Sequence, residues 1–264
     1  RCNNIVGCTA RTQKLLFCFI AISSNFLNAA TPSQDLIPIH EALVPKFTDP
    51  IPLSIVQNAP PAPVFENVPT QPYPDFIWIP GYWSFVESVN DYVWICGVWR
   101  RPPTDLIWIP GSWNHINKGW VFARGFWSTV PIANLNYINA TPPPTITDNI
   151  PPSPGNNYFF IPGFWNYSAS EEKYEWLSGK WELSNPDWIL APSSYVWRPS
   201  GFVFVPSYWD WPLEGRGVAY SCSAVNEPLV AIEPTIIVQR LFFYYPDYTI
   251  FYWHWWHHHP EWGW

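Results

Sequence analysis

Four histidines near the end of the sequence form its most site-like cluster: His254, His257, His258 and His259. Neutral imidazoles bind Zn, Cu or Ni well, so this cluster is a candidate metal site. No carboxylate or thiolate stands beside it at a clear ligand spacing, and terminal His tracts often have only incidental affinity. Both interpretations stay open. Nothing else in the sequence calls for a cofactor, and we expect none.

Carboxylates could support glycoside hydrolysis, which needs two acids across the scissile bond together with aromatic subsites. The candidate acids are Asp91, Asp105, Asp187, Asp210 and Glu214. Asp105 and Asp187 stand in proline-containing stretches, where Asp commonly stabilises a turn. The sequence has no GxSxG, HExxH, phosphate-binding loop or paired CxxC motif. We therefore expect a protein without enzymatic activity.

An N-terminal segment, residues 1–30, has the layout of a secretory signal. Arg11 and Lys14 form a basic region, residues 15–22 form a short apolar core, and small residues close the segment. The apolar core is too short to span a bilayer, and no other segment approaches the roughly 20 apolar residues that a span needs. We expect an exported protein, in the periplasm, in the outer envelope or on the cell surface, without a transmembrane span.

Two of the five cysteines, Cys96 and Cys222, lie downstream of this signal-like segment. Two cysteines in an oxidising compartment could form a disulfide. Two separate buried thiols are the alternative, because nothing in the sequence places these residues together.

Composition excludes some classes of function. Charged residues make up 12% of the chain, against roughly 25% in typical soluble domains. The formal net charge is −7, and Lys and Arg are not clustered, so the chain lacks the electrostatic pattern of a nucleic-acid binder. The 32 prolines leave little room for long helices, because each removes an amide donor and clashes with the preceding turn.

Aromatic residues recur in a hexad: aromatic, two residues, Gly, any residue, aromatic. Copies begin at positions 78, 94, 108 and 122, and again at positions 160, 176, 190 and 204. The spacing within the second set is identical to that within the first, so one fixed offset, from position 78 to position 160, relates all four pairs. We call it the repeat offset. The sequence is therefore internally duplicated. The third copy of the second set, residues 190–195, has lost the Gly and both tryptophans.

The duplication divides the chain into segments. They are a signal-peptide region (1–30), a proline-rich linker (31–74), a first module (75–130), a second proline-rich linker (131–156), a second module (157–215) and an aromatic and His-rich tail (216–264). The linkers are expected to be extended, polyproline-like spacers.

The distance between successive hexads, as from position 78 to 94 or from 94 to 108, suits one strand plus one turn. We expect turns in the polar stretches 88–91, 115–119 and 168–172, and the hexads within strands or at strand ends with their Gly at a bulge. Each module is predicted to be a four-stranded antiparallel meander, so that the fold is all-β. The two modules would pack as a sandwich or form two small barrels.

The hexads, together with Tyr-Trp-Asp-Trp-Pro-Leu-Glu-Gly-Arg-Gly at 208–217, resemble the WXXGXW (YXWGXW) repeat family of exported bacterial proteins. The resemblance covers about residues 75–217. It implies export and an envelope setting, and it carries over no catalytic residue.

Three functions follow. Repetition without chemistry favours a structural or assembly role, with an envelope protein or a second copy as partner. The alternative is carbohydrate or peptidoglycan binding on the tryptophans that close hexads: Trp99, Trp113, Trp181 and Trp209. Burial of these rings in the core competes with that alternative, because exposing all the tryptophans would create very large apolar patches. An enzyme is the third.

Overall fold

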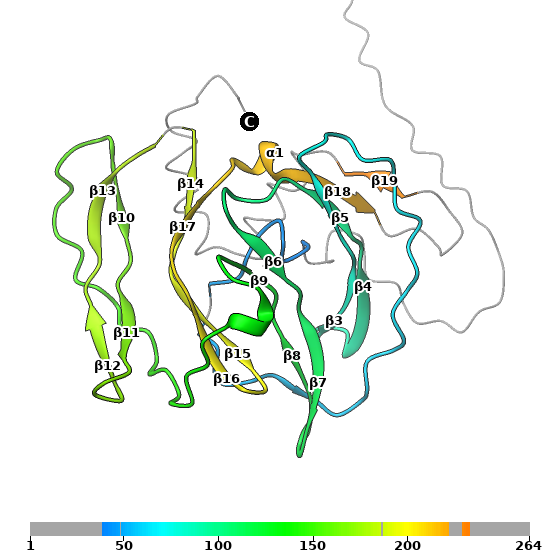
Figure 1. Ribbon diagram of the computed structural model, residues 1–264, viewed down its shortest axis with the longest axis horizontal. Coiled ribbons are helices and arrows are strands. Elements are labelled where there is room, and N and C mark those ends of the chain that lie inside the picture. Colours follow the sequence, from blue (N-terminus) through cyan, green and yellow to red (C-terminus); the bar gives the residue numbers. More distant parts are fainter. Residues whose placement is uncertain (1–38, 48, 186, 222–228, 233–264) are drawn as a thin grey trace, which may run out of the picture. The chain divides into compact units, whose positions relative to one another are not determined.

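The computed structural model describes residues 39–47, 49–185, 187–221 and 229–232, which belong to one compact unit, Pro32–Trp264. This part of the chain is built from short antiparallel strands (Figure 1), so the all-β class is confirmed. Helix in it is limited to α1 (Leu213–Arg216) and a 3₁₀ turn at Ile132–Asn134. None of its helices is long and apolar enough to cross a membrane.

The hexads pair two by two into bent hairpins. In hairpin 1, β2 (Ile77–Ile79) and β3 (Tyr82–Val86) form one arm, and β4 (Asp91–Ile95) and β5 (Val98–Arg100) form the other. β3 pairs with β4 and β2 pairs with β5. The first aromatic of each hexad therefore lies opposite the last aromatic of the other hexad.

The same plan recurs three times, with the first strand of each hairpin paired to the fourth and the second to the third. Hairpin 2 comprises β6 (Ile107–Ile109), β7 (Ser112–Ile116), β8 (Gly119–Ala123) and β9 (Phe126–Ser128). Hairpin 3 comprises β10 (Tyr158–Ile161), β11 (Phe164–Ser168), β12 (Lys173–Leu177) and β13 (Lys180–Leu183). Hairpin 4 comprises β14 (Ile189–Ala191), β15 (Ser194–Arg198), β16 (Gly201–Val205) and β17 (Tyr208–Asp210).

The turns expected in the polar stretches are confirmed, but the bulge expected at the hexad Gly is wrong. Turns connect the arms at residues 87–90, 117–118 and 169–172. Trp78 lies opposite Trp99 and Trp83 opposite Trp94, so the register is unchanged across the hexad. A bulge would add one residue to one arm and shift the register by one. Both arms instead interrupt their ladder over facing residues, and the hairpin bends as a unit.

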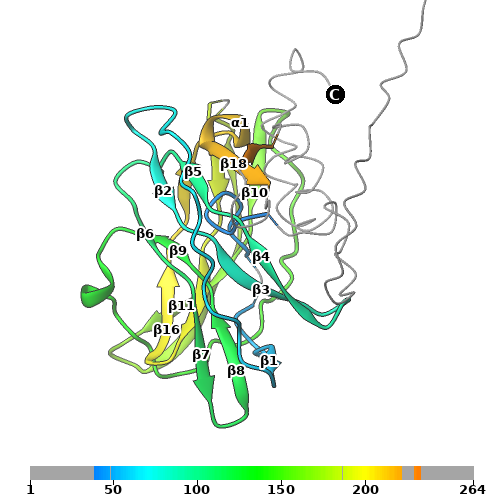
Figure 2. The same cartoon turned by 90° about the vertical axis from the view of Figure 1, so that its right-hand side faces the viewer.

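The meander expected within each module needs a correction. β5 pairs with β2 and with β18 (Gly217–Ser221), and it does not pair with β6. Each module is thus a pair of hairpins rather than a continuous four-stranded sheet. β18 also pairs with β19 (Val230–Ala231), and β1 (Ile55–Val56) adds to hairpin 2 beside β8 (Figure 2).

The proline-rich segments before each module lie along the hairpins. We name residues 56–69 strap 1 and residues 138–151 strap 2. The carbonyl of Ala62 accepts the indole N–H of Trp83 at 2.8 Å, and the carbonyl of Pro144 accepts that of Trp165 at 2.9 Å. These two contacts, like the hexads, are related by the repeat offset. The duplicated structural unit therefore consists of a strap and two hairpins.

A fully buried ion cluster joins the two modules. The Asp210 carboxylate of hairpin 4 accepts two 2.6 Å hydrogen bonds from the Arg100 guanidinium of hairpin 1, and Arg216 lies 3.3 Å away. The side chains of all three residues have 0% exposure. A buried carboxylate that pairs with two guanidinium groups holds its partners in fixed positions, because separating them leaves buried charges unpaired.

Candidate functional site

The four tryptophans expected to form a binding face lie on four different hairpins and are all half-buried. Trp99, Trp113 and Trp181 donate their indole N–H groups to main-chain carbonyls, at 2.8–3.0 Å. Two of these carbonyls, those of Pro69 and Pro151, belong to straps 1 and 2. These three rings therefore hold straps and hairpins together. Trp209 differs, because it lines a cleft.

The remaining candidates from the sequence fall into two groups. His254, His257, His258, His259 and Cys222 lie outside the described residues. Cys96 is buried and disulfide-bonded. Within the ranges that the structure describes, no cluster of three or more His, Cys, Asp or Glu residues could hold a metal ion.

The candidate acids are not brought together in a cleft. Asp91, Asp105 and Asp187 are exposed at strand ends and turns. Asp105 has φ +59°, the left-handed conformation that Asp tolerates well in a turn. Asp210 belongs to the buried ion cluster. None of the five acids lines the cleft described below.

The structure adds a carboxylate that binds both hexads of a hairpin and that the sequence interpretation missed. In hairpin 1, Glu66 of strap 1 accepts the backbone N–H groups of Gly81 at 2.9 Å and Gly97 at 2.8 Å, and the indole N–H of Trp94 at 3.0 Å. Asp148 of strap 2 accepts the corresponding N–H groups of Gly163 and Gly179, at 2.6 and 3.2 Å. We call this arrangement the carboxylate clamp.

Three neighbours together explain why the hexad contains Gly. A Cβ at Gly97 would lie 2.4 Å from the Trp78 ring, 2.7 Å from a Glu66 oxygen and 2.8 Å from the Ile79 carbonyl oxygen. Only a residue without a side chain fits between the ring, the facing strand and the carboxylate. A signal for the clamp does exist in the sequence: Glu66 and Asp148 are both acidic and are related by the repeat offset.

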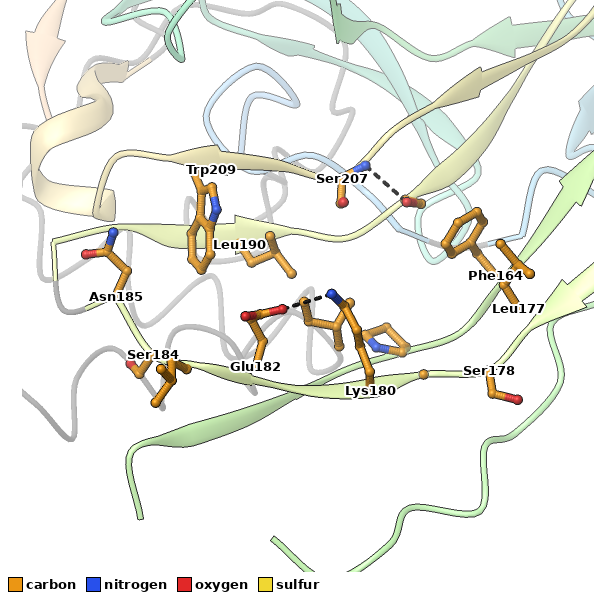
Figure 3. A pocket seen from close by; sticks show the side chains of 15 residues that line it. Phe164, Leu177, Ser178, Lys180, Glu182, Ser184, Asn185, Leu190, Ser207 and Trp209 are labelled. Carbon is orange, nitrogen blue, oxygen red and sulfur yellow. Dashed lines mark hydrogen bonds and ion pairs between the residues drawn. The ribbon is translucent and has the colours of Figure 1, made fainter. Parts of the chain in front are cut away.

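Hairpins 2 and 4 provide different acceptors for the amide N–H groups at the hexad Gly positions. In hairpin 2 the acid is Glu41, which accepts the Gly125 N–H at 2.9 Å. In hairpin 4 both glycines are replaced by serine, and the Ser193 hydroxyl accepts the Ser207 N–H at 3.0 Å (Figure 3). The degenerate third hexad of the second module therefore carries its own acceptor.

Glu41 belongs to a buried segment, residues 39–44, which we call the plug. The plug lies between hairpins 1 and 2, where it contacts Pro80 and Gly125, and it shares a core cluster with Phe159 of hairpin 3 and Ile189 of hairpin 4. The His40 Nε2 donates to the Pro80 carbonyl at 3.1 Å, because its Nδ1 accepts the Ala42 N–H. Its ring packs edge-on against Tyr82, with centroids 5.1 Å apart. Arg100 Nε donates to the Ala42 carbonyl at 2.8 Å.

Burial shifts the pKa values of both ionisable plug residues. It lowers the pKa of His40 to about 4. It raises the pKa of Glu41 to about 7, although the Gly125 N–H and the nearby Lys46, Arg124 and Arg198 charges oppose the shift. Each shift favours the neutral form of the side chain, as expected for groups removed from water.

The equivalent space between hairpins 3 and 4 is open, with a volume of about 760 Å³. We call it the module-2 cleft (Figure 3). Its walls include Pro162, Phe164, Glu182, Ser193, Ser207 and Trp209. Its ionisable lining residues are Lys180 and Glu182, which form an exposed ion pair with the Lys180 Nζ 2.9 Å from a Glu182 oxygen.

The lining of this cleft combines aromatic rings with a few polar groups. Trp209 and Phe164 supply apolar ring surface, and serine hydroxyls with one ion pair supply polar contacts. Small sites that bind a ligand commonly combine an apolar lining with a few polar groups. A single lining carboxylate does not provide the two acids that glycoside hydrolysis uses.

The residues that the structure describes define an all-β protein of short antiparallel hairpins. No protein-family model, no curated protein and no solved structure matches it.

Proposed function

We propose that this protein is a non-catalytic repeat protein with a structural or assembly role at the bacterial cell envelope, to which it is exported. One observation carries the proposal: hexad residues serve to hold the chain together. Tryptophan N–H groups bind the straps, and hexad amides bind carboxylates of the plug and straps. Residues used in this way stabilise a scaffold rather than catalyse a reaction.

Two observations support export. Residues 1–30 have the layout of a secretory signal. Cys96 is disulfide-bonded, and disulfides persist mainly in oxidising compartments. The resemblance of the hexads to the WXXGXW repeat family of exported bacterial proteins agrees with both.

Exposed apolar side chains on and beside strap 1 support a protein partner. Phe65 is 91% exposed, Tyr73 61% and Val68 52%. Large apolar side chains that gather on a short surface segment commonly mark a contact with another protein.

The test is the association state of the purified protein, measured by light scattering after size-exclusion chromatography, and its partners in intact envelopes, identified by chemical crosslinking. We expect self-association or one reproducible crosslinked envelope protein, and loss of that contact in a Phe65→Ser, Tyr73→Ser variant with an unchanged melting temperature. Exposed substitutions of this kind rarely affect stability. A strictly monomeric protein with no crosslinked partner would overturn the assembly role.

Carbohydrate binding is a second candidate because Trp209, one of the four tryptophans predicted from the sequence, lines the module-2 cleft together with Asn185 and Glu182. Such a site would respond to peptidoglycan fragments with a change in tryptophan fluorescence. Trp209→Phe should remove the response, whereas Trp181→Phe, in hairpin 3, should leave it.

A further inference from the structure

We propose that the module-2 cleft binds an extended polypeptide segment of a partner protein, in the place that the plug occupies in module 1. The inference rests on the proposed assembly function and deepens it, because it names the docking site and the class of ligand. The internal duplication supports it by providing a filled and an open version of the same space.

The polar contacts that the plug makes with the hairpins of module 1 have counterparts on the cleft wall. His40 donates to Pro80, Glu41 accepts from Gly125, and Arg100 donates to Ala42. The repeat offset takes Pro80, Gly125 and Arg100 to Pro162, Ser207 and Glu182, and all three of these residues line the cleft.

The apolar contacts correspond as well. The His40 ring packs against Tyr82, and the plug shares its core cluster with Ile79 and Trp127, a cluster against which Ile161 and Trp209 of module 2 also pack. Their counterparts at the repeat offset are Phe164, Ile161 and Trp209, which also line the cleft. The cleft is therefore lined at the positions that correspond to those around the plug, and with similar ring surfaces.

One feature of the expected ligand is retained from the plug. Pro162 offers a carbonyl where Pro80 accepts the His40 N–H, and Phe164 offers a ring where His40 meets Tyr82. The matching ligand residue carries a ring with an N–H donor, which means His or Trp.

Two features of the ligand are expected to differ. A Cβ at Gly111, the counterpart of Ser193, would lie 2.6 Å from the Glu41 carboxylate. The serine side chain thus takes the space and the acceptor role of an acid, so the ligand residue after the ring must be small. Arg100 is replaced by Glu182, and Val98 by Lys180. The Lys180 ammonium then becomes the donor for a ligand backbone carbonyl.

The probe for the test is a fluorescein-labelled peptide, Leu-Ile-Pro-Ile-His-Ala-Ala-Leu-Val-Pro-Lys, which is residues 36–46 with Glu41 replaced by Ala. Binding to the full-length protein is measured by fluorescence anisotropy. We expect saturable binding, and binding about tenfold weaker for the same peptide with its Glu, because the carboxylate meets the Ser193 side chain.

Three protein variants distinguish the cleft from other surfaces. Ser178→Trp fills the exposed edge of the cleft and should weaken binding by about tenfold, whereas Ser88→Trp, in the exposed turn of hairpin 1, should leave it unchanged. Glu182→Arg restores the donor that Arg100 provides in module 1 and should tighten binding. A gain of affinity cannot result from misfolding, so this variant keeps the test decisive.

Several outcomes would overturn the inference. They are no binding of either peptide, equal binding by Ser178→Trp and the parent, or displacement of the peptide by peptidoglycan glycan fragments. A protein that binds the peptide only after deletion of residues 233–264 would identify its own tail as the occupant, which contradicts a partner segment. If Ser178→Trp loses the peptide but still associates in size-exclusion chromatography, the cleft binds a peptide and the assembly role stands, but the assembly partner docks elsewhere, which overturns the claim that the cleft is its docking site.

Discussion

Glu66 and Asp148 occupy equivalent positions in the two halves of the duplication, and the carboxylate of each accepts the amide N–H groups of two glycines, one from each arm of a bent hairpin. Hydrogen bonds from backbone amides to an ionised carboxylate are stronger than bonds between neutral groups. Each carboxylate therefore fixes the bend of a hairpin and attaches a strap to it.

Removing the clamp should destabilise hairpin 1 strongly. Glu66→Ala leaves three N–H donors without their acceptor, and we expect a loss of about 2–4 kcal/mol in the free energy of unfolding. Urea denaturation followed by tryptophan fluorescence measures it. The matched control is Glu87→Ala, at an exposed turn position of the same hairpin, which should cost no more than about 0.5 kcal/mol. Equal losses in the two variants would contradict the clamp.

The two forms of the clamp should be interchangeable. Gly111→Ser alone is expected to destabilise hairpin 2, because its Cβ would lie 2.5 Å from the Phe122 ring and 2.6 Å from the Glu41 carboxylate. In a Glu41→Ala background the new serine can accept the Gly125 N–H, as Ser193 accepts that of Ser207. The double variant should therefore lose less stability than the sum of the single variants, by about 1 kcal/mol or more. Additive losses would show that the serine does not replace the acid.

Local features of the fold could be predicted from the sequence, and long-range ones could not. The turn at 87–90 follows from a polar stretch between two β-forming runs, and the duplication follows from spacing alone. The pairing of Arg100 with Asp210 joins residues 110 positions apart, for which one sequence holds no signal. The prolines of strap 1 predict an extended spacer, because they indicate the conformation of the chain but not what that chain contacts.

The same limit applies to the candidate site. Trp209 is predicted as a hexad residue, and it does line the module-2 cleft. The cleft itself could not be foreseen, because it exists only where the plug is missing between two hairpins. Nothing in the local sequence of Pro162 or Glu182 distinguishes an open space from a filled one.

The buried ion cluster should be essential to the joining of the modules. Asp210→Asn removes the negative charge between Arg100 and Arg216 and leaves two buried guanidinium groups unpaired. We expect a loss of about 3–5 kcal/mol in the free energy of unfolding, measured by chemical denaturation. Asp105→Asn, at an exposed turn, is the control and should be nearly neutral. A mild effect of Asp210→Asn would mean that the two guanidinium groups do not depend on this carboxylate.

The disulfide of Cys96 is predicted to involve Cys222. β18 pairs with β5 so that Gly217 faces Arg100 and Ala219 faces Val98. In an antiparallel ladder this direction leads the chain after Ala219 toward Cys96. Mass spectrometry of an unreduced proteolytic digest should show one linked peptide that contains both residues, and Cys222→Ser should abolish it. A link from Cys96 to any of Cys2, Cys8 or Cys18 would disprove the pairing.

The two ionisable residues of the plug should contribute pH dependences of opposite sign to the stability. The folded pKa of His40 is lowered from 6.5 to about 4, so its contribution is present above pH 6.5 and is lost as pH falls through 4. The folded pKa of Glu41 is raised from 4.5 to about 7, so its contribution is present below pH 4.5 and is lost as pH rises through 7. Between pH 4.5 and 6.5 the rise in stability with pH that His40 contributes offsets the fall in stability that Glu41 contributes.

Single variants should reveal the pH dependence of stability that each residue contributes. In Glu41→Gln only His40 remains, and stability should rise with pH between 4 and 6.5, by up to about 1.4 kcal/mol per pH unit. In His40→Gln only Glu41 remains, and stability should fall with pH between 4.5 and 7. Urea midpoints measured across this pH range for the parent and both variants decide the matter. Parallel pH profiles for all three proteins would show that neither plug residue changes its protonation between the folded and unfolded states in this range.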